Sequence, residues 1–163
     1  AGEVARLYRE FRPDGVFIDG GGVGGGVVDR CRQLNIPVWD IQFGGKSDAA
    51  PSDEAQRFKN KRSEMWGAMK EWLKIGMIPK DQELMNELTG PMYGFSNTDE
   101  IQLERKSDMK RRGVGSPDRA DALALTFAYP VRSALAGGNT VTKAPPRRAN
   151  GGPQSSILRG RRS

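Results

Sequence analysis

Three aspartates stand where their side chains could hold a divalent cation. Asp19 ends a short apolar run, Val16–Ile18, and a glycine-dense loop follows it at once. Asp118 and Asp121 are three residues apart in the last segment with helical periodicity, so a helix would place both on one face. Carboxylate oxygens suit Mg²⁺ and Mn²⁺, and such ions can drive phosphodiester hydrolysis. The pattern favours a metal-assisted hydrolytic site built from Asp19, Asp118 and Asp121.

The glycine loop supports a competing chemistry. Gly20, Gly22 and Gly25 satisfy the G-x-G-x-x-G pattern of dinucleotide-binding loops, after an expected strand and before an expected helix. Asp40 stands where a ribose-binding acid would lie. Against this interpretation, Asp19 would place a negative charge beside the pyrophosphate, and only one β-α-β pattern is present. A third possibility is a permissive loop that lets another chain or DNA approach closely.

The composition excludes several kinds of catalytic and metal site. The chain has no histidine and one cysteine, which excludes histidine-based triads, histidine-ligated metals and disulfides within the chain. Any acid–base catalysis or metal binding must therefore use Asp, Glu and Lys side chains. No apolar run approaches the roughly 20 residues that cross a bilayer, so no membrane partner is expected.

Periodicity predicts an α/β fold. Residues 16–19 and 37–43 are expected as parallel strands of a β-α-β unit, because the helix that joins them carries Val27, Cys31 and Leu34 on one face. Other helices are expected at 3–11, 53–75, 79–88, 106–112 and 116–129, and further strands at 92–95 and 101–104. Ser116 is the expected N-cap of the last helix. In a purely structural alternative, Asp118 serves this helix start and Asp121 is solvated.

Two basic stretches are candidates for DNA contact. One lies on the predicted long helix and the other precedes the acidic helix, so both could draw phosphate towards the carboxylates. The candidate residues are Lys59, Lys61, Arg62, Lys106, Lys110, Arg111 and Arg112. The alternative is that each stretch is only a solvated helix face.

Three runs resemble motifs of the nuclease domain in the large terminase subunits of tailed bacteriophages. Residues 17–24, FIDGGGVG, resemble the second acidic motif of that family, and residues 58–66, FKNKRSEMW, resemble its central helix. Residues 104–113 followed by 116–123 resemble its C-terminal acidic motif. The motifs stand in the family's order, which makes the set more specific than any one of them.

The resemblance implies a ribonuclease-H-like mixed sheet flanked by helices over residues 1–130. It implies an endonuclease that cuts concatemeric double-stranded DNA with Mg²⁺ or Mn²⁺, which activates water for attack on phosphorus. Asp19 would be the second catalytic carboxylate and Asp118 the third, with Asp121 as a further ligand or an orienting group. Expected partners are double-stranded DNA, the terminase small subunit and the portal protein, in the host cell cytoplasm.

The chain departs from the family pattern at its N-terminal side. The family's first catalytic Asp lies on a strand upstream of the helix that opens this sequence, and nothing matches the ATPase motif G-x-x-x-x-G-K-[ST]. We therefore expect a domain incomplete at its N-terminal side, marginally stable and weak or inactive as a nuclease. A nucleotide-binding module and a non-catalytic DNA- or portal-binding fragment stay open as alternatives.

Residues 131–163 are expected to form a basic, disordered tail. They are rich in Gly, Pro, Ser and Arg and carry seven cationic side chains with no acid, so the +6 of the chain leaves about −1 on residues 1–130. The basicity of the protein therefore lies in the tail, where it could bind DNA or a portal partner.

Deleting residues 131–163 should weaken the salt dependence of DNA binding. Each phosphate that the tail no longer neutralises lowers the slope of log affinity against log salt by roughly 0.9. Fluorescence anisotropy with a double-stranded probe over a salt series, on residues 1–163 and 1–130, measures both slopes. Equal slopes would rule out a DNA-binding role for the tail.

Overall fold

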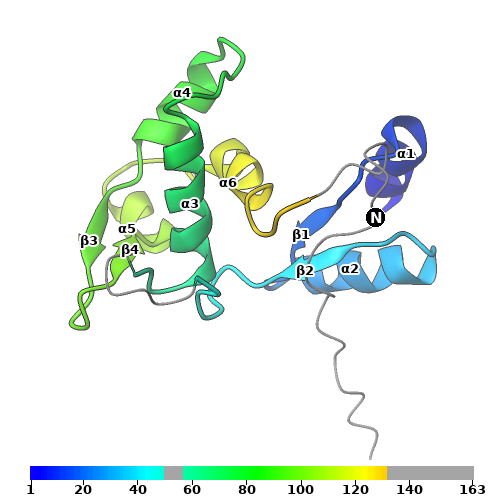
Figure 1. The fold of residues 1–163 in the computed structure, drawn as a ribbon, viewed down its shortest axis with the longest axis horizontal. Coiled ribbons are helices and arrows are strands. Elements are labelled where there is room, and N and C mark those ends of the chain that lie inside the picture. The colour runs from blue at the N-terminus through cyan, green and yellow to red at the C-terminus, as the bar shows by residue number, and fades with distance from the viewer. Residues whose placement is uncertain (50–56, 132–163) are drawn as a thin grey trace, which may run out of the picture.

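The computed structural model describes residues 1–49 and 57–131 (Figure 1). The predicted tail lies outside the described residues from residue 132 onward, as do residues 53–56 of the predicted long helix. The helices are α1 (Gly2–Phe11), α2 (Gly24–Gln33), α3 (Lys61–Trp72), α4 (Gln82–Thr89), α5 (Lys106–Arg111) and α6 (Asp118–Leu125). The strands are β1 (Phe17–Asp19), β2 (Trp39–Ile41), β3 (Tyr93–Phe95) and β4 (Ile101–Leu103). No helix in the described ranges combines the length and the apolar character that a membrane span needs.

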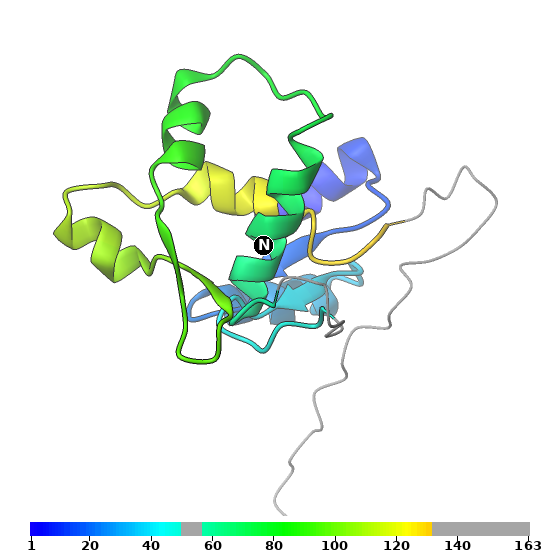
Figure 2. The same cartoon turned by 60° about the vertical axis from the view of Figure 1, so that its left-hand side comes forward.

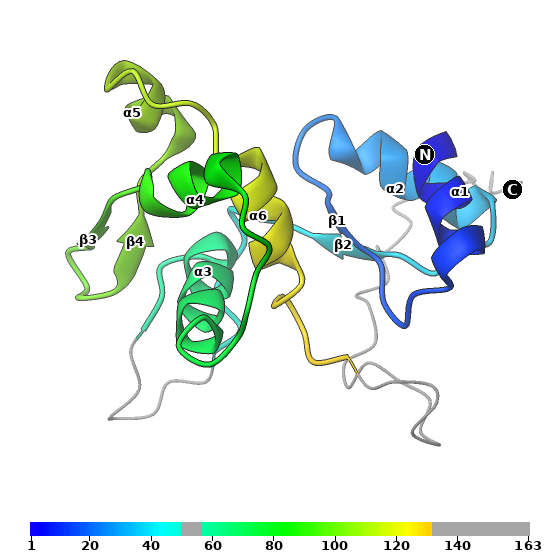
Figure 3. The ribbon, with the colours of Figure 1, turned by 90° about the horizontal axis from the view of Figure 1, so that it is seen from above.

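The predicted parallel β-α-β unit is confirmed. β1 and β2 pair in parallel, with Phe17 opposite Trp39 and Asp19 opposite Ile41, and α2 joins them. One face of this pair packs on α1 and α2 around Val28 and Cys31. The other face packs on α3 and α6, so the strands form the middle of three layers (Figure 3).

The second pair of strands forms a separate hairpin. β3 and β4 are antiparallel and correspond to the strands predicted at residues 92–95 and 101–104, with a turn at residues 96–99 between them. β4 also pairs through its other edge with the extended residues before α3, since the Lys59 N–H donates to the Ile101 carbonyl over 2.9 Å. The hairpin projects from one side of the molecule (Figure 2). The strands of the described residues are thus divided between two small sheets.

The long helix begins later than its periodicity predicts. Asn60 is its N-cap, because its side-chain oxygen accepts the Ser63 N–H over 2.9 Å. Phe58, which falls inside the predicted helix at residues 53–75, instead forms a bridge with Ile101. The prediction for residues 57–60 was wrong because pairing with β4 holds this segment extended.

The last helix also starts differently from the prediction. Ser116 does not cap it, since its hydroxyl donates to Asp118. Glu87 of α4 caps it instead, and one oxygen of its carboxylate accepts the N–H groups of Arg119 and Ala120 over 2.7 and 2.9 Å. The helix ends at Leu125 rather than near residue 129. A carboxylate from a neighbouring helix thus satisfies the free donors at this helix start.

A buried ion pair joins α3 to α6. Arg62 donates through Nε to Asp121 Oδ1 over 2.9 Å, and Trp66 donates through Nε1 to the same oxygen over 2.8 Å. Arg62 also donates through Nη1 to the Glu104 carbonyl over 2.8 Å. The side chains of Arg62 and Asp121 are only 10% and 5% exposed. Three segments far apart in the sequence therefore meet at one guanidinium.

Asp121→Asn should destabilise the protein by about 3–5 kcal/mol, because it leaves the Arg62 charge buried without a counter-charge. Urea unfolding followed by circular dichroism gives the free energy. Asp29→Asn is the matched control, because Asp29 is 63% exposed and its pair with Arg32 should contribute less than about 1 kcal/mol. Equal losses in the two variants would contradict a structural role for the buried pair.

Two glycines of α2 provide a matched test of close packing. A Cβ at Gly24 would lie 1.7 Å from the carbonyl oxygen of Asp19, whereas a Cβ at Gly26 would meet nothing within 4 Å. We expect Gly24→Ala to cost about 1–3 kcal/mol through overpacking and Gly26→Ala to stabilise the helix by up to about 1 kcal/mol. Thermal and urea unfolding check both values, and a stable Gly24→Ala variant would refute the close approach.

Candidate functional site

Asp19 presents a carboxylate at the carboxyl end of β1. The side chain is half-buried, and its Oδ1 accepts the Gly21 N–H over 3.1 Å. Its Oδ2 accepts no hydrogen bond from the described residues. Side chains alternate along a strand, so Asp19 shares the face of Phe17, which packs towards α3 and α6. One oxygen of Asp19 is thus held by the loop while the other stays available to a ligand.

The glycine loop is packed against the protein's own carboxylates. A Cβ at Gly20 would lie 1.7 Å from Asp40 Oδ1, so Asp40 covers the start of the loop. Asp40 is the middle residue of β2 rather than its end, and it accepts the Gln42 side-chain amide over 2.7 Å. The geometry that a dinucleotide would need is therefore only partly present. The strand, loop and helix are there, but Asp40, the acid proposed to bind ribose, packs over Gly20 instead.

Asp118 is exposed at the start of α6. Its side chain is 76% exposed, and its Oδ1 accepts the Ser116 hydroxyl over 2.6 Å. The Lys106 ammonium lies 3.3 Å from the same oxygen. The hydrogen bond from Ser116, followed by the contacts with Lys106, lowers the pKa of Asp118. Asp118 is therefore an ionised, accessible oxygen donor.

Asp121 is withdrawn from solvent. Its Oδ1 is taken by Arg62 and Trp66, and Lys106 Nζ lies 2.9 Å from its Oδ2. The Lys106 ammonium is the ion-pair partner of Oδ2, whereas Arg62 Nη2 has no hydrogen-bond acceptor among the described residues. The structural alternative of a solvated Asp121 does not match this burial.

Lys106 links the two aspartates of α6. Burial would lower the pKa of Lys106, but its contacts with Asp121 and then Asp118 outweigh burial and raise it. Lys106 is therefore a charged ammonium that neutralises part of the negative charge of this helix start. The sequence interpretation placed Lys106 only in a phosphate-attracting stretch and did not identify this contact.

Two of the predicted DNA-binding residues are buried. Lys61 is only 5% exposed at its side chain, and its ammonium pairs with Glu64 over 2.5 Å and with Asp48 over 3.3 Å. It also lies 4.5 Å from the centroid of the Tyr129 ring. Burial, followed by the hydrogen bond to Asp48, raises the pKa of Tyr129 to about 12.

The loop after β2 accounts for this burial. It covers the start of α3, because the Lys61 and Arg62 N–H groups donate to the Gly45 and Phe43 carbonyls over 2.8 and 3.0 Å. The expectation of a solvent-facing basic stretch at Lys61 and Arg62 is therefore corrected by the structure.

The other basic candidates lie at the surface. Lys59 and Lys106 are about half exposed, and Lys110 and Arg111 are exposed. Arg112 pairs with Glu104 over 2.6 Å, and its guanidinium lowers the pKa of Glu104 to about 2. Arg111 in turn pairs with Asp108 but stays 79% exposed, and Lys106 is shared between two carboxylates. Lys110 is the α5 cation with no ion pair among the described residues.

The predicted three-aspartate metal site is not assembled in the described residues. Within residues 1–49 and 57–131, no group of three or more Asp, Glu, His or Cys side chains is placed to hold a metal ion. Asp19 and Asp118 each offer oxygen atoms that suit Mg²⁺ or Mn²⁺, and Mg²⁺ commonly uses one or two carboxylates with water and phosphate. Asp121 does not fit as a ligand, because Arg62, Trp66 and Lys106 already hold it.

Comparisons with solved structures identify the fold of the chain. No protein-family model matches the chain, and no curated protein matches it. The nuclease domain of the large terminase subunit of bacterial virus Sf6 matches with 23% identity, over 77% of this chain and 70% of the solved chain, at a TM-score of 0.65. A single-substitution variant of the same Sf6 domain, solved with manganese, matches with the same values. A variant solved with calcium matches with 23% identity over 77% of this chain and 69% of that one, also at a TM-score of 0.65.

These neighbours show the fold of the chain. The resemblance stated from the three sequence motifs is confirmed at the level of structure, because the same nuclease domain is found by comparing coordinates. The predicted α/β, ribonuclease-H-like class is confirmed with it. The chain has the fold of the terminase nuclease domain.

Proposed function

We propose that this chain is the nuclease part of a phage DNA-packaging terminase, cutting concatemeric double-stranded DNA by phosphodiester hydrolysis with Mg²⁺ or Mn²⁺. The observation that carries the proposal is Asp19, a carboxylate with an available oxygen at a strand end. It lies in a chain that shares its fold with a nuclease domain solved with manganese. In this proposal the partners are DNA, the terminase small subunit and the portal protein, and the place of action is the host cell cytoplasm.

In this proposal the three aspartates and Lys106 have different roles. Asp19 and Asp118 would hold the ion, and a divalent ion bound there supplies Lewis acidity and lowers the pKa of water. Asp121 is a positioning residue, because its pair with Arg62 fixes α6 and therefore Asp118. The Ser116 hydroxyl, followed by Lys106, lowers the pKa of Asp118, and Lys106 also places positive charge beside it.

DNA contact is proposed for the exposed cations alone. These are Lys59, Lys106, Lys110 and Arg111, whose charge would draw the phosphate backbone towards Asp118. Lys61 and Arg62 act within the fold instead, since both are buried and ion-paired. A bound phosphate would also compete for Lys106 and leave Asp118 more open to a metal ion.

Plasmid cleavage tests the proposal. We expect residues 1–163 to nick supercoiled DNA weakly with Mn²⁺ and not with EDTA. Asp19→Asn and Asp118→Asn should reduce nicking to background, because each removes an oxygen donor of the ion. Asp29→Asn, an exposed aspartate of α2, should keep wild-type activity. Cleavage that persists in Asp19→Asn would contradict the site.

Thermal stability gives a second measurement that does not depend on turnover. At about ten times the dissociation constant, Mn²⁺ should stabilise the chain by roughly 1.4 kcal/mol, a rise of a few degrees in Tm. Asp19→Asn should lose this rise and Asp29→Asn should keep it. Stabilisation by NAD but not by Mn²⁺ would favour the nucleotide-binding alternative.

A further inference from the structure

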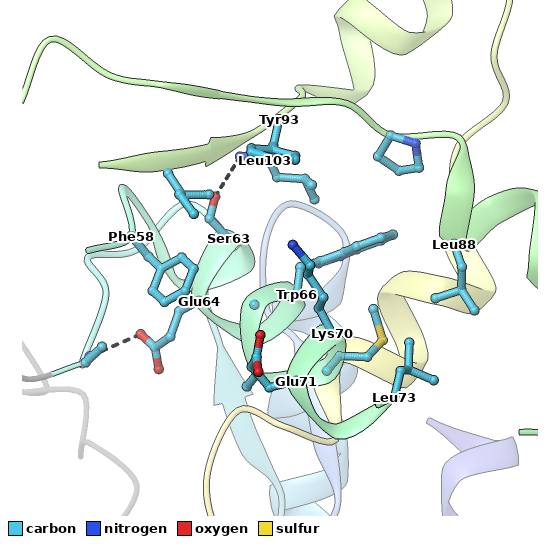
Figure 4. Close-up of a pocket in the computed structure, with 16 residues that line it drawn as sticks. Phe58, Ser63, Glu64, Trp66, Lys70, Glu71, Leu73, Leu88, Tyr93 and Leu103 are labelled. Carbon is cyan, nitrogen blue, oxygen red and sulfur yellow. Dashed lines mark hydrogen bonds between the residues drawn. The ribbon is translucent and has the colours of Figure 1, made fainter. Parts of the chain in front are cut away.

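An apolar groove separates α3 from the β3–β4 hairpin. Its volume is about 680 Å³, which lies within the range of ligand and peptide sites. Trp66 and Met69 of α3, with Leu73 directly after the helix, line one side, and Tyr93 and Leu103 of the hairpin line the other (Figure 4). The groove contains none of the aspartates that we assign to hydrolysis.

Exposed apolar side chains continue beyond the groove. Tyr93 on its wall is 60% exposed, and the neighbouring Met92 and Phe95 are 58% and 62% exposed. Tyr93 and Phe95 lie on one face of β3 with their ring centroids 6.3 Å apart. A gathering of large exposed apolar residues around a groove indicates contact with a macromolecule rather than with water alone.

One uncompensated positive charge lies at the groove. Among its charged lining residues, Glu71 pairs with Lys74 over 2.5 Å and Glu64 pairs with Lys61 over 2.5 Å. Lys70 has no carboxylate partner among the described residues, and its ammonium lies 5.6 Å from the centroid of the Tyr93 ring. The groove therefore combines an apolar floor with an exposed ammonium that has no carboxylate partner among the described residues.

We propose that this groove binds an amphipathic helix of a partner protein, with its apolar side chains against Trp66 and Leu73 and a carboxylate on Lys70. Such helices place apolar residues at i, i+3, i+4 and i+7 into grooves of this kind. The charge argues against the protein's own residues 131–163 as the occupant, because they carry seven cations and no acid. The inference is independent of the proposed nuclease activity.

Fluorescence anisotropy with designed helical peptides tests the proposal on residues 1–163. The acidic probe carries leucines at i, i+3, i+4 and i+7 with flanking glutamates, and the basic probe carries the same leucines with flanking lysines. We expect the acidic probe to bind at least about fivefold more tightly. Lys70→Glu should reverse that preference, whereas Lys80→Glu, an exposed lysine outside the groove lining, should not.

A groove-filling variant separates this site from other surfaces. Ala68 is an exposed residue of the groove lining, so Ala68→Trp should fill the groove without disturbing the core and weaken the acidic probe at least about tenfold. Ala122→Trp, at an exposed alanine of α6 outside the groove, is the matched control. Circular dichroism and plasmid nicking verify that both variants fold and act like the parent chain.

Three results would overturn the proposal. The first is equal binding of the acidic and basic probes, and the second is unchanged binding to Ala68→Trp. The third is a combination of results. The small apolar anion anilinonaphthalene sulfonate binds, Ala68→Trp weakens that binding, and the acidic peptide does not bind. That last pattern would make the groove a small-molecule pocket instead.

Discussion

The buried pair of Arg62 and Asp121 is the interaction on which the arrangement of this chain depends. It joins α3 to α6, and the same guanidinium reaches the carbonyl of Glu104 just after β4. A buried pair adds little net stability compared with apolar packing, but it is costly to break and it fixes geometry. The alanines Ala120, Ala124 and Ala128 bring α6 into the same core. The pair therefore sets where α6 lies, and through α6 it sets where Asp118 is presented.

Backbone packing fixes the position of Asp19, the second candidate metal ligand. Asp19 is held at the end of β1 because α2 starts against its carbonyl, an approach that only glycine permits at position 24. The Gly21 N–H then fixes one carboxylate oxygen. The glycines thus orient an acid, and this use explains why the loop satisfies a phosphate-binding pattern without the open geometry of a phosphate site.

The sequence predicts those features that local signals determine. Apolar runs and breakers were sufficient for β1, α2 and β2 and for the β3–β4 hairpin, and they placed Asp19 at a strand end. The start of α3 was not predictable from periodicity, because pairing of residues 57–59 with β4 overrides it. Likewise, Glu87 rather than Ser116 serves α6, because the neighbouring α4 brings a carboxylate to the helix start. These errors share one cause, which is a partner distant in sequence.

The two aspartates of α6 show where sequence reasoning about a site reaches its limit. Their three-residue spacing places both on one side of the helix, and Lys106 does contact both. That spacing is equally compatible with two metal ligands and with one metal ligand beside one residue that holds the helix in the core. Arg62 and Trp66, more than fifty residues upstream, decide between these roles by holding Asp121 in the core. Asp118 has no such partner on α3, so it stays at the surface, where a metal ion and a phosphate can reach it.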